Sequence, residues 1–571
     1  MKENPLGSCK QEVLYSIKKV LLNLGYGEPK IVLETPPEEK GDISFSCFFL
    51  AKEAKKAPQK IAEEIAEKIA LGECIEKCEN VGAYVNFFIN PIKLAEMILN
   101  ATLEMGDDFG NLPSLSKKII LEHTSANPTD KLHVGRARNP IIGDSLARIM
   151  RKAGYDVETQ YYVDDMGKQA VTLAYGVEIW NKRPSDDDSL GPYQYASKIV
   201  AENPEAEAIR DDWLKKLESG DPEISEKVKE ACKKVMEKDI TSDLARINVT
   251  VDKYVYESQF VFDGSVEKVV DYLKENQYCD MEEGAYFIDL APFTQKGGKF
   301  FFQRSDGTSL YATRDIAYHL WKYEHCDDVI NILGEDNKLE SEYVKTGLGI
   351  LGLGKAPEVI FYSFVSLPEG KMSTRRGKVV FLNDLIDEAE ELAYEEVKKR
   401  REDLGEDRMR KIANNVGIGA IRYNIVRVQP EKKITFRWEE ALNFEGNSAP
   451  FIQYSHARAS SILRKAAELG YKDHKQFDPT LLGTPSEISL IKEMAGFPEV
   501  IKECAERRTP HTMAGYAYRL ASMFNQFYRD CPVLPSEDEL LRNSRLALVG
   551  GVKTVLKNSL FCLGISAPEE M

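Results

Sequence analysis

Residues 117–163 read KKIILEHTSANPTDKLHVGRARNPIIGDSLARIMRKAGYDVETQYYV, and this stretch decides the fold. It opens with an apolar run that predicts a strand of a buried parallel sheet. A polar loop follows, and DVETQYYV at the end predicts a second strand. The residues between loop and strand show the 3.6-residue spacing of a helix. This apolar stripe consists of Ile142, Leu146, Ile149, Met150 and Ala153. Together these elements predict a βαβ unit with a right-handed crossover.

Pro140 lies inside the helical pattern. Proline is tolerated only in the first turn of a helix, where the amides lack partners, or at a bend. We therefore expect the helix to begin near Gly135 or Arg136, with its free amide groups beside the preceding loop. Such a helix start is suited to binding a phosphate group.

A second βαβ unit follows further along the chain. Residues 314–325 predict a helix, residues 328–334 predict a buried strand, and PEVIFYSFV at 357–365 predicts another strand after a second helix. Directly before them, KFFFQRSDGTSLYAT at 299–313 predicts a hairpin around the SDGT turn. Two βαβ halves place the chain in the α/β class, with a Rossmann-type doubly wound parallel sheet.

The regions on either side differ from this core. Residues 1–110 alternate amphipathic helices with short strands and predict a separate α/β module. Residues 181–245 are charged and helical, which indicates an insertion. From about 384 to 571 nearly every segment has helical periodicity, which predicts an all-α bundle attached to the α/β core.

The composition is that of an ordinary globular protein. With 571 residues, 43% hydrophobic residues and a mean hydropathy of −0.37, collagen-like, mucin-like and wholly disordered proteins are excluded. We expect three or four domains, no membrane span and no signal peptide. The ten cysteines include one close pair, Cys74 and Cys78, which one helical turn could bring together. Since no second pair completes a zinc site, we expect reduced thiols and a cytoplasmic protein.

The net charge of −16, from 76 basic and 92 acidic residues, argues against a protein that coats nucleic acid in bulk. An RNA partner remains compatible with it if the cations gather on one face.

Three groups of residues could carry chemistry. His133, Val134, Gly135 and Arg136 stand at the predicted helix start, where His133 could donate a hydrogen bond to a phosphate oxygen or could only cap the loop. The segment LPEGKMSTRRGKVVF, residues 367–381, has the charge to hold a pyrophosphate leaving group but also fits a solvated surface turn. Its four cations are Lys371, Arg375, Arg376 and Lys378.

The third group is a set of carboxylates. It comprises Glu122, Asp164, Asp165 and Asp315. Asp315 is expected in the first turn of a helix, where an acidic residue often only complements the helix dipole. Tyr311 precedes it by four residues, at the expected end of a strand. Such a pair at the carboxyl edge of a sheet could also bind a cationic side chain.

Several long motifs in the same order resemble the arginyl-tRNA synthetase family of class I aminoacyl-tRNA synthetases. They include TSANPTDKLHVGRARNPIIGDSLARIMRKAGYDV, KMSTRRG, YATRDIAYH, FIQYSHARASSIL, LASMFNQFYRDCPVL and the terminal LGISAPEEM. Two further motifs, GDISFSCFFLAKEAKKAPQKIAEEIA and NVGAYVNFFI, lie near the N-terminus. The resemblance covers nearly the whole chain and is weakest over 180–300.

The resemblance implies four parts. These are an N-terminal domain for the tRNA elbow at 1–112, a Rossmann-type catalytic domain at 113–383 with an insertion near 181–300, a helical connecting region at 384–446 that meets the acceptor stem, and a helical anticodon-binding domain at 447–571. It implies an enzyme that activates L-arginine with ATP and Mg²⁺ and transfers arginine to the terminal adenosine of its tRNA. The family needs tRNA during activation. No tightly bound metal and no membrane partner are predicted, and a monomer is expected.

The resemblance also assigns residues. The catalytic set is His133, Gly135, Arg136, Lys371, Met372 and Ser373. Pro128, His133, Gly135, Lys371, Met372 and Ser373 would bind ATP. Glu122, Ser125 and Asn127 would contact arginine near its α-groups, while Tyr311 and Asp315 would bind the guanidinium. Tyr84, Asn86, Tyr454 and Met571 would contact tRNA.

Two residues depart from the family pattern. Arg136 replaces the second histidine of the first signature, and Thr374 replaces the second lysine of the basic loop. Because of these two differences, a second hypothesis stays open, in which the protein is a non-catalytic tRNA-binding relative with the same fold. A different adenylyl-transferring enzyme on the same core is the third reading, which the long helical C-terminal half argues against.

Overall fold

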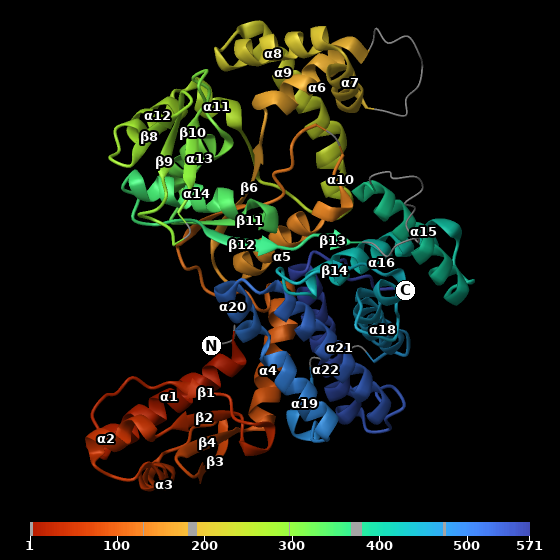
Figure 1. The fold of residues 1–571 in the computed structure, drawn as a ribbon. Helices are drawn as coiled ribbons and strands as arrows, with labels where there is room; N and C mark the ends of the chain where they lie inside the picture. The colour runs from red at the N-terminus through yellow and green to blue at the C-terminus, as the bar shows by residue number, and fades with distance from the viewer. Residues whose placement is uncertain (1–3, 130, 181–190, 296, 367–379, 472–475) are drawn as a thin grey trace. The chain divides into compact units, whose positions relative to one another are not determined.

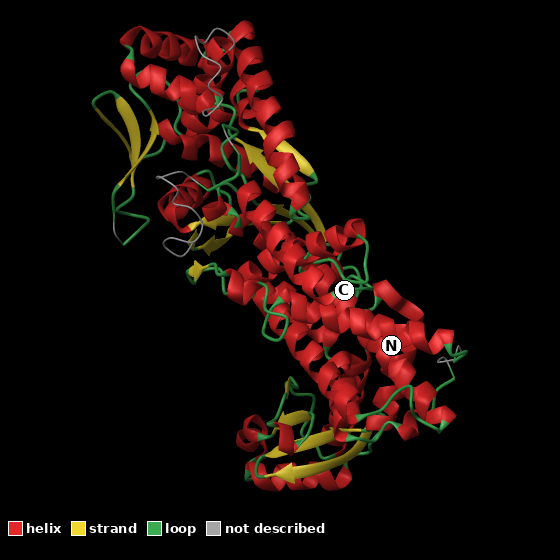
Figure 2. Ribbon diagram, turned by 90° about the vertical axis from the view of Figure 1, so that its right-hand side faces the viewer, coloured by secondary structure: helices red, strands yellow, loops and turns green. Residues whose placement is uncertain are grey.

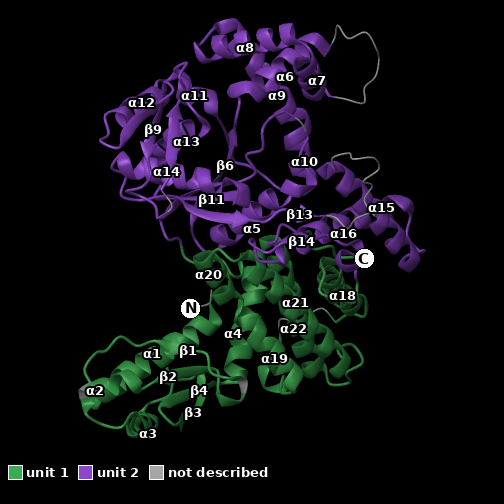
Figure 3. Ribbon diagram, in the orientation of Figure 1, with its two compact units in different colours: residues 1–113, 444–562, 566–571 green, residues 114–443, 563–565 purple. Residues whose placement is uncertain are grey.

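The structure is a computed structural model that describes residues 4–129, 131–180, 191–295, 297–366, 380–471 and 476–571 (Figure 1). The chain forms two compact units (Figure 3). Unit 1 comprises Met1–Pro113, Phe444–Cys562 and Ser566–Met571, and unit 2 comprises Ser114–Asn443 and Leu563–Ile565. Helices make up most of the fold, and the strands gather in separate sheets (Figure 2). In the described part of the chain, no helix is both long enough and apolar enough to cross a membrane.

Unit 2 is built on a five-stranded parallel sheet with the order β12-β11-β5-β6-β7. The strands are β5 (Lys118–Glu122), β6 (Asp156–Val163), β7 (Lys253–Tyr256), β11 (Asp328–Gly334) and β12 (Glu358–Tyr362). The chain runs outward from β5 to one edge and then returns to fill the other edge from β11. This reversal beside β5 is the switch point of a doubly wound sheet, where such folds bind ligands. The predicted fold class is confirmed.

The helix of the first βαβ unit is α5 (Arg138–Lys152), preceded by the 3₁₀ turn η4 (Val134–Arg136). Pro140 lies in its first turn, as expected. The whole predicted apolar stripe is buried. Gly143 allows α5 to pack closely on the sheet, because a Cβ there would lie 2.4 Å from the Cβ of His123.

Helices join β6 to β7. They are α6 (Gly167–Trp180), α7 (Pro192–Glu202), α8 (Pro204–Glu218), α9 (Pro222–Val235), the π-helical turn η5 (Met236–Ile240) and α10 (Thr241–Arg246). After β7 come α11 (Glu257–Phe262), α12 (Ser265–Lys274) and a three-stranded antiparallel sheet of order β10-β9-β8. Its strands are β8 (Cys279–Glu282), β9 (Ala285–Asp289) and β10 (Lys299–Gln303).

The hairpin predicted at 299–313 is wrong in its second arm. Strand β10 pairs with β9. The two sides of the SDGT turn pair only over a short stretch, through a bridge between Gln303 and Ser309 and backbone hydrogen bonds from Arg304 to Thr308 and from Leu310 to Phe302. Helix α13 (Tyr311–His325) begins immediately afterwards. The Phe302 carbonyl accepts a hydrogen bond of 3.3 Å from the Leu310 amide and one of 2.8 Å from the Thr313 hydroxyl of α13. Tyr311 is therefore the first residue of a helix rather than the end of a strand, and Asp315 lies one turn further on.

The rest of unit 2 is mainly helical. It contains η6 (Glu335–Asn337), α14 (Lys338–Ile350), α15 (Leu382–Arg400), α16 (Glu406–Val426), α17 (Trp438–Ala441) and a short parallel pair of β13 (Val365–Ser366) with β14 (Ile434–Thr435).

A three-residue segment near the C-terminus, Leu563–Ile565, also belongs to unit 2. The guanidinium of Arg422, on α16, donates a hydrogen bond of 2.8 Å to the Leu563 carbonyl and pairs with Asp144 of α5. Gly564 has a φ of +67°, and a Cβ there would lie 2.0 Å from that guanidinium. The segment thus needs glycine for both conformation and space.

Unit 1 combines an antiparallel sheet of order β1-β2-β4-β3 with helices. The strands are β1 (Leu33–Glu34), β2 (Ile43–Ser46), β3 (Ile75–Val81) and β4 (Tyr84–Ile89). The first helices are α1 (Pro5–Asn23), α2 (Ala51–Ala54), α3 (Pro58–Lys68) and α4 (Pro91–Met105), with 3₁₀ turns at Glu38–Lys40, Phe48–Leu50 and Gly106–Asp108. The C-terminal helices are α18 (Ala449–Glu468), α19 (Pro485–Ala495), α20 (Phe497–Arg507), α21 (Pro510–Asp530) and α22 (Glu539–Cys562), with a further 3₁₀ turn at Pro479–Leu481.

The helical turn considered for Cys74 and Cys78 is also wrong. Cys78 lies within β3 and Cys74 directly precedes this strand. A strand separates residues four apart by roughly 13 Å, so the two thiols cannot meet. All ten cysteines are free thiols.

We expect Gly143→Ala to lower the midpoint of thermal unfolding. The added Cβ would clash with the His123 side chain, directly after β5, and overpacking of a core typically costs about 1–3 kcal/mol. Gly349→Ala, on α14, is the matched control, because a Cβ there meets nothing within 4 Å and alanine favours a helix by up to about 1 kcal/mol. Equal midpoints for the two variants would contradict the packing described for α5.

Candidate active site

The loop after β5 is held in an unusual conformation at the switch point. Thr124 and Ser125 both have positive φ, +73° and +39°. The side chain of Asn139, on α5, accepts a hydrogen bond of 2.8 Å from the Thr124 amide and donates one of 3.0 Å to the Ile332 carbonyl. The Ser125 hydroxyl donates to the Glu122 carboxylate at 2.8 Å and accepts from the Tyr162 amide at 3.1 Å. The loop is thus fixed to three neighbouring strands.

His133 caps the turn that follows this loop. Its Nδ1 accepts a hydrogen bond of 2.8 Å from the Gly135 amide, so the proton of the neutral ring lies on Nε2. The residue is accessible to solvent, although the surrounding protein covers part of its ring. This partial desolvation and the charge of the nearby Arg136 lower the pKa of His133, which favours the neutral form. Gly135 is buried, and a Cβ there would lie 3.0 Å from the His133 ring.

The amides at this helix start are not free, contrary to expectation. Val134 donates to the Val380 carbonyl, Gly135 to the His133 ring, and the next two amides to backbone carbonyls of the same turn. Backbone pairing with Val380 therefore uses one donor that the sequence pattern left for a phosphate, and the turn itself uses the others.

The described residues on either side of 367–379 lie against this helix start. Leu382 donates a hydrogen bond of 2.7 Å to the Leu132 carbonyl, and His133 forms an antiparallel bridge with Phe381. On the other side, Val365 pairs with Ile434 in the β13–β14 pair. Lys371, Met372, Ser373 and the other cations of the predicted phosphate loop lie outside the described residues.

Arg138, in the first turn of α5, holds the backbone near β13 and β14 in place. Its guanidinium is fully buried and donates hydrogen bonds of 2.5 to 3.3 Å to four backbone carbonyls. These carbonyls belong to Ser363, Val428, Gln429 and Lys432. Burial lowers the pKa of Arg138 to about 10, which still leaves it charged at neutral pH.

The polar face of α13 supplies most of the buried charge. It consists of Tyr311, Arg314, Asp315, Tyr318, His319 and Lys322, at the i, i+3 and i+4 spacing of one helix face. The Lys322 ammonium is fully buried. It lies 2.5 Å from the Glu122 carboxylate and 3.2 Å from the side-chain amide oxygen of Asn331, on β11. It also lies 3.9 Å from the centre of the Tyr318 ring.

His319 connects Asn331 with Asp315. Its Nε2 is 2.7 Å from the Asn331 amide nitrogen. Its Nδ1 is 2.8 Å from the Asp315 carbonyl oxygen and 3.1 Å from the Asp315 carboxylate. Burial works against ionisation of Asp315, but His319 and Lys322 lower its pKa below the ordinary value. No lysine or arginine forms an ion pair with Asp315 among the described residues.

A second buried pair lies beside it. Arg314 forms an ion pair of 2.9 Å with Glu257, and both side chains are 2% exposed. Burial and the Glu257 charge raise the pKa of Asp164 well above its ordinary range. A protonated Asp164 could donate to Glu257, which would satisfy two oxygens that otherwise have no partner among the described residues.

Two further carboxyl groups have raised pKa values. Burial, followed by the charges of Asp315 and Glu257, raises the pKa of Glu340, on α14, to about 7. Burial raises the pKa of Asp165 to about 6, although Ser258 donates two hydrogen bonds to it. Among the described carboxyl groups of this site, Asp315 is the one whose pKa is lowered and which has no ion pair with a lysine or arginine.

The structure also places other residues that the sequence predicted to bind substrate arginine or ATP. The Asn127 amide donates a hydrogen bond of 2.6 Å to Gln169. Pro128 is buried. Tyr311 is 41% exposed, and a Cβ on Gly167 would lie 3.3 Å from its hydroxyl. The Arg136 guanidinium is 3.9 Å from Asp336, which places it toward η6.

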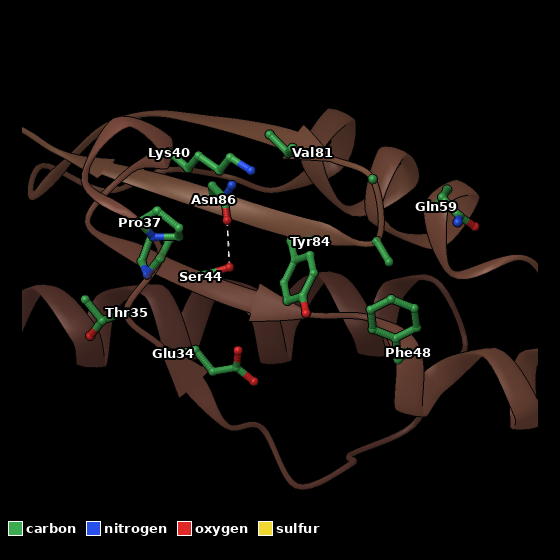
Figure 4. A pocket seen from close by; sticks show the side chains of 13 residues that line it. Glu34, Thr35, Pro37, Lys40, Ser44, Phe48, Gln59, Val81, Tyr84 and Asn86 are labelled. Atoms are coloured by element: carbon green, nitrogen blue, oxygen red, sulfur yellow. Dashed lines mark hydrogen bonds between the residues drawn. The ribbon is translucent and has the colours of Figure 1, made fainter.

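The predicted tRNA contacts lie in unit 1. Tyr84 and Asn86 line a cavity of about 540 Å³ in the N-terminal sheet (Figure 4). Asn86 accepts a hydrogen bond of 2.6 Å from Ser44, and the Tyr84 ring meets Phe48 edge-on at 5.7 Å. In the C-terminal helices, Tyr454 is 40% exposed and 4.8 Å from the Arg458 guanidinium. Met571 is partly buried at the chain end.

Sequence reasoning missed six residues of this site. They are Glu257, Arg314, His319, Lys322, Asn331 and Glu340. Four of them carry signals that could have been found, because Arg314, His319 and Lys322 share one face of a predicted helix with Asp315, and Asn331 interrupts an apolar strand. Their partners on other elements became clear only with the sheet order.

We expect Arg138→Lys to destabilise unit 2 by roughly 2–5 kcal/mol. Lysine cannot donate to four carbonyls in fixed directions, and each lost hydrogen bond to a charged group costs about 1.5–3 kcal/mol. Urea unfolding measures the loss. Arg136→Lys is the control, since its exposed pair contributes at most about 1 kcal/mol. Indistinguishable urea midpoints for the two variants would reject the anchoring role of Arg138.

The sequence matches three family models. They are the catalytic domain of class I (R) tRNA synthetases over residues 99–438, the DALR anticodon binding domain over 452–571 and the arginyl tRNA synthetase N terminal domain over 9–89. The first alone spans more than half of the chain.

Similar proteins share nearly the full length. An arginine–tRNA ligase of Methanocella arvoryzae is 47% identical over 97% of this chain and 98% of its own. One of Methanocaldococcus jannaschii is 43% identical over 98% and 100%. The structure of arginyl-tRNA synthetase from Thermus thermophilus is similar with a TM-score of 0.81 and 28% identity, covering 98% of this chain and 100% of that one. The chain therefore belongs to the arginyl-tRNA synthetase family of class I aminoacyl-tRNA synthetases.

Proposed function

We propose that the protein is an arginine–tRNA ligase. It activates L-arginine with ATP to arginyl-adenylate and pyrophosphate, and then transfers arginine to the terminal adenosine of its tRNA. The observation that carries this proposal is the position of Asp315 on the polar face of α13, where no lysine or arginine among the described residues forms an ion pair with it. A guanidinium is planar and always charged, and a carboxylate is its natural partner.

The arginine site follows from this charge arrangement. Asp315 and Tyr311 bind the guanidinium, and Glu340 supplies a further carboxyl group close to Asp315. Glu122, Ser125 and Asn127 lie on the α-amino and carboxylate side. Both Glu122 oxygens already accept hydrogen bonds, from Ser125 and Lys322, so Glu122 acts here mainly by holding the loop.

ATP binds at the helix start. The His133 Nε2–H and the Gly135 amide donate to phosphate oxygens, beside Pro128, and a phosphate at Gly135 takes the amide that now donates to the His133 ring. Lys371, Met372 and Ser373 complete the phosphate site, and Mg²⁺ enters with ATP. Arg136 contributes positive charge from the direction of Asp336.

The chemistry requires no covalent enzyme intermediate. The arginine carboxylate attacks the α-phosphorus of ATP, the bond to the bridging oxygen breaks, and pyrophosphate leaves. A ribose hydroxyl of the terminal adenosine then attacks the activated carbonyl, and AMP leaves. The protein acts by aligning the reactants and stabilising the charge that develops on the phosphates.

The tRNA contacts belong to unit 1. Tyr84 and Asn86 meet the tRNA elbow at the cavity of Figure 4. Tyr454 and Met571 contribute to the anticodon surface. We propose the division into an elbow domain at 1–112, a catalytic domain at 113–383, a connecting region at 384–446 and an anticodon domain at 447–571, in a cytoplasmic monomer.

The proposal is tested by charging total tRNA with each amino acid in turn, and by ATP–pyrophosphate exchange with and without tRNA. Arginine alone should be charged. Charging of another amino acid would reject the proposal. A tight tRNA complex without ATP turnover would instead favour the non-catalytic relative that Arg136 and Thr374 leave open.

We expect Asp315→Asn to raise the KM for arginine by about 10- to 100-fold. The change removes a hydrogen bond to a charged group, which contributes about 1.5–3 kcal/mol. The KM for ATP should stay within about threefold. Steady-state charging measures both constants, with Asp271→Asn on α12 as a control of equal chemistry. An unchanged arginine KM would remove Asp315 from the site.

The KM for arginine should fall as the pH rises from 6 to 8. Burial and neighbouring carboxylates raise the pKa of Glu340 to about 7, so this group gains the charge that attracts a guanidinium within this window. The sign for stability is opposite, because a carboxyl pKa above its unfolded value means that stability is lost as the pH rises through 7. Glu340→Gln should flatten the KM profile and Glu342→Gln should leave it unchanged; a persistent slope in Glu340→Gln would contradict this role.

A further inference from the structure

Four side chains, three from α13 and one from β11, form a continuous relay (residues Lys322, Asn331, His319 and Asp315). The Lys322 ammonium donates a hydrogen bond of 3.2 Å to the side-chain amide oxygen of Asn331. The Asn331 amide nitrogen lies 2.7 Å from His319 Nε2. His319 Nδ1 lies 3.1 Å from the Asp315 carboxylate. Lys322 and His319 are at most 1% exposed, and Asn331 is 3% exposed.

The direction of each hydrogen bond in this relay is fixed. An ammonium group can only donate, so Lys322 holds the oxygen of the Asn331 amide and turns its NH₂ group toward His319. His319 Nε2 must then accept. At the other side of the ring, Nδ1 faces a backbone carbonyl, which can only accept, so Nδ1 carries the proton. Two independent neighbours thus select the same neutral tautomer.

The relay determines what Asp315 presents to a ligand. A neutral ring donates its Nδ1–H toward Asp315 and leaves the negative charge of the carboxylate in place. A ring protonated on both nitrogens would pair with Asp315 and compete with an incoming cation. Lys322 further offsets the charge of Glu122, as Arg314 does for Glu257, so that Asp315 remains as the uncompensated charge among these groups.

We propose that Lys322 is a positioning residue for substrate specificity: through Asn331 it keeps His319 in the neutral Nδ1–H form, and it thereby keeps Asp315 available for a guanidinium. This proposal rests on the proposed arginine-binding role of Asp315. Lys322 touches no reactant in it and acts only through the three side chains of the relay.

A purely structural role for Lys322 makes a different prediction. A buried ion pair that only fills the core would affect stability when broken, and it would leave the tautomer of His319 and the ratio of the KM values for arginine and ATP unchanged. The state of the histidine ring is therefore the informative measurement, since folding alone does not determine it.

The test uses Asn331→Asp in the full-length protein. Both carboxylate oxygens of the new side chain accept, so His319 Nε2 faces an acceptor and must take up a proton. We expect ¹⁵N NMR of labelled histidine side chains to show this change for the His319 signal, which His319→Gln identifies. The KM for arginine should rise at least about tenfold, as expected when an opposite charge pairs with Asp315, while the KM for ATP stays within about threefold.

Asn276→Asp is the matched control. It introduces the same chemical change in unit 2, at a side chain whose oxygen accepts from the Tyr278 amide and keeps doing so. It should change neither the His319 signal nor the KM for arginine. An unprotonated His319 Nε2 in Asn331→Asp, or a protonated one with an unchanged KM for arginine, would overturn the proposal.

A second variant covers the case in which Asn331→Asp does not fold. Lys322→Met combined with Glu122→Gln removes both charges of the buried pair, an exchange that cores often tolerate. Asn331 can then turn its side-chain oxygen toward His319 Nε2, while the Asp315 carbonyl still keeps a proton on Nδ1. The His319 signal should therefore report a ring that is partly protonated on Nε2, and a fully neutral Nδ1–H ring in this variant would also overturn the proposal. Failure of arginine charging by the unaltered protein would reject the proposed function, and the NMR result would still decide the relay.

Discussion

The candidate site depends on the hydrogen bonds that the buried Lys322 ammonium donates to Glu122 and Asn331. The ammonium joins α13 to the end of β5 through Glu122 and to β11 through Asn331, so it spans the switch point of the sheet. Removing one partner of such a pair costs about 3–5 kcal/mol, because the other charge is left buried and unpaired. The pair is therefore costly to break, and its main effect is to hold three elements and the charges they carry in one arrangement.

The phosphate side of the site depends on a different kind of contact. Backbone pairing of residues 132–134 with 380–382, together with the four carbonyls bound by Arg138, brings the first signature and the flanks of the basic loop together. The backbone pairing does not depend on which side chain stands at position 136, whereas the hydrogen bonds of Arg138 require its guanidinium. The replacement of a histidine by Arg136 therefore alters the charge at the turn and leaves its framework intact.

Much of the fold could be predicted because its signals are local. Pro140 placed the start of α5, the apolar stripe placed its buried face, and the alternation of strands and helices gave the doubly wound sheet. One prediction failed where a helix begins earlier than expected, because α13 starts at Tyr311 and ends the second arm of the hairpin. Another failed where a distant segment competes for a hydrogen bond, because the Val380 carbonyl accepts from the Val134 amide that was expected to be free.

Only part of the candidate site could be predicted, because some of its contacts join residues that are far apart in sequence. Motif resemblance found Asp315 and Glu122, but the residues that set their charge are separated from them in sequence. Glu122 and Lys322 are 200 residues apart, and their contact follows from the placement of α13 over β5. Whether a carboxylate is free to bind a ligand depends on such partners, and the sequence alone does not identify them.

The central claim is that one uncompensated carboxylate selects a permanently charged guanidinium. Citrulline tests it most directly, because its side chain has nearly the shape of arginine and no charge. We predict that the kcat/KM for tRNA charging is at least about 10⁴-fold higher for arginine than for citrulline, as for sites built on polar pairing. A difference below about tenfold would show that shape, and not the charge of Asp315, selects the substrate.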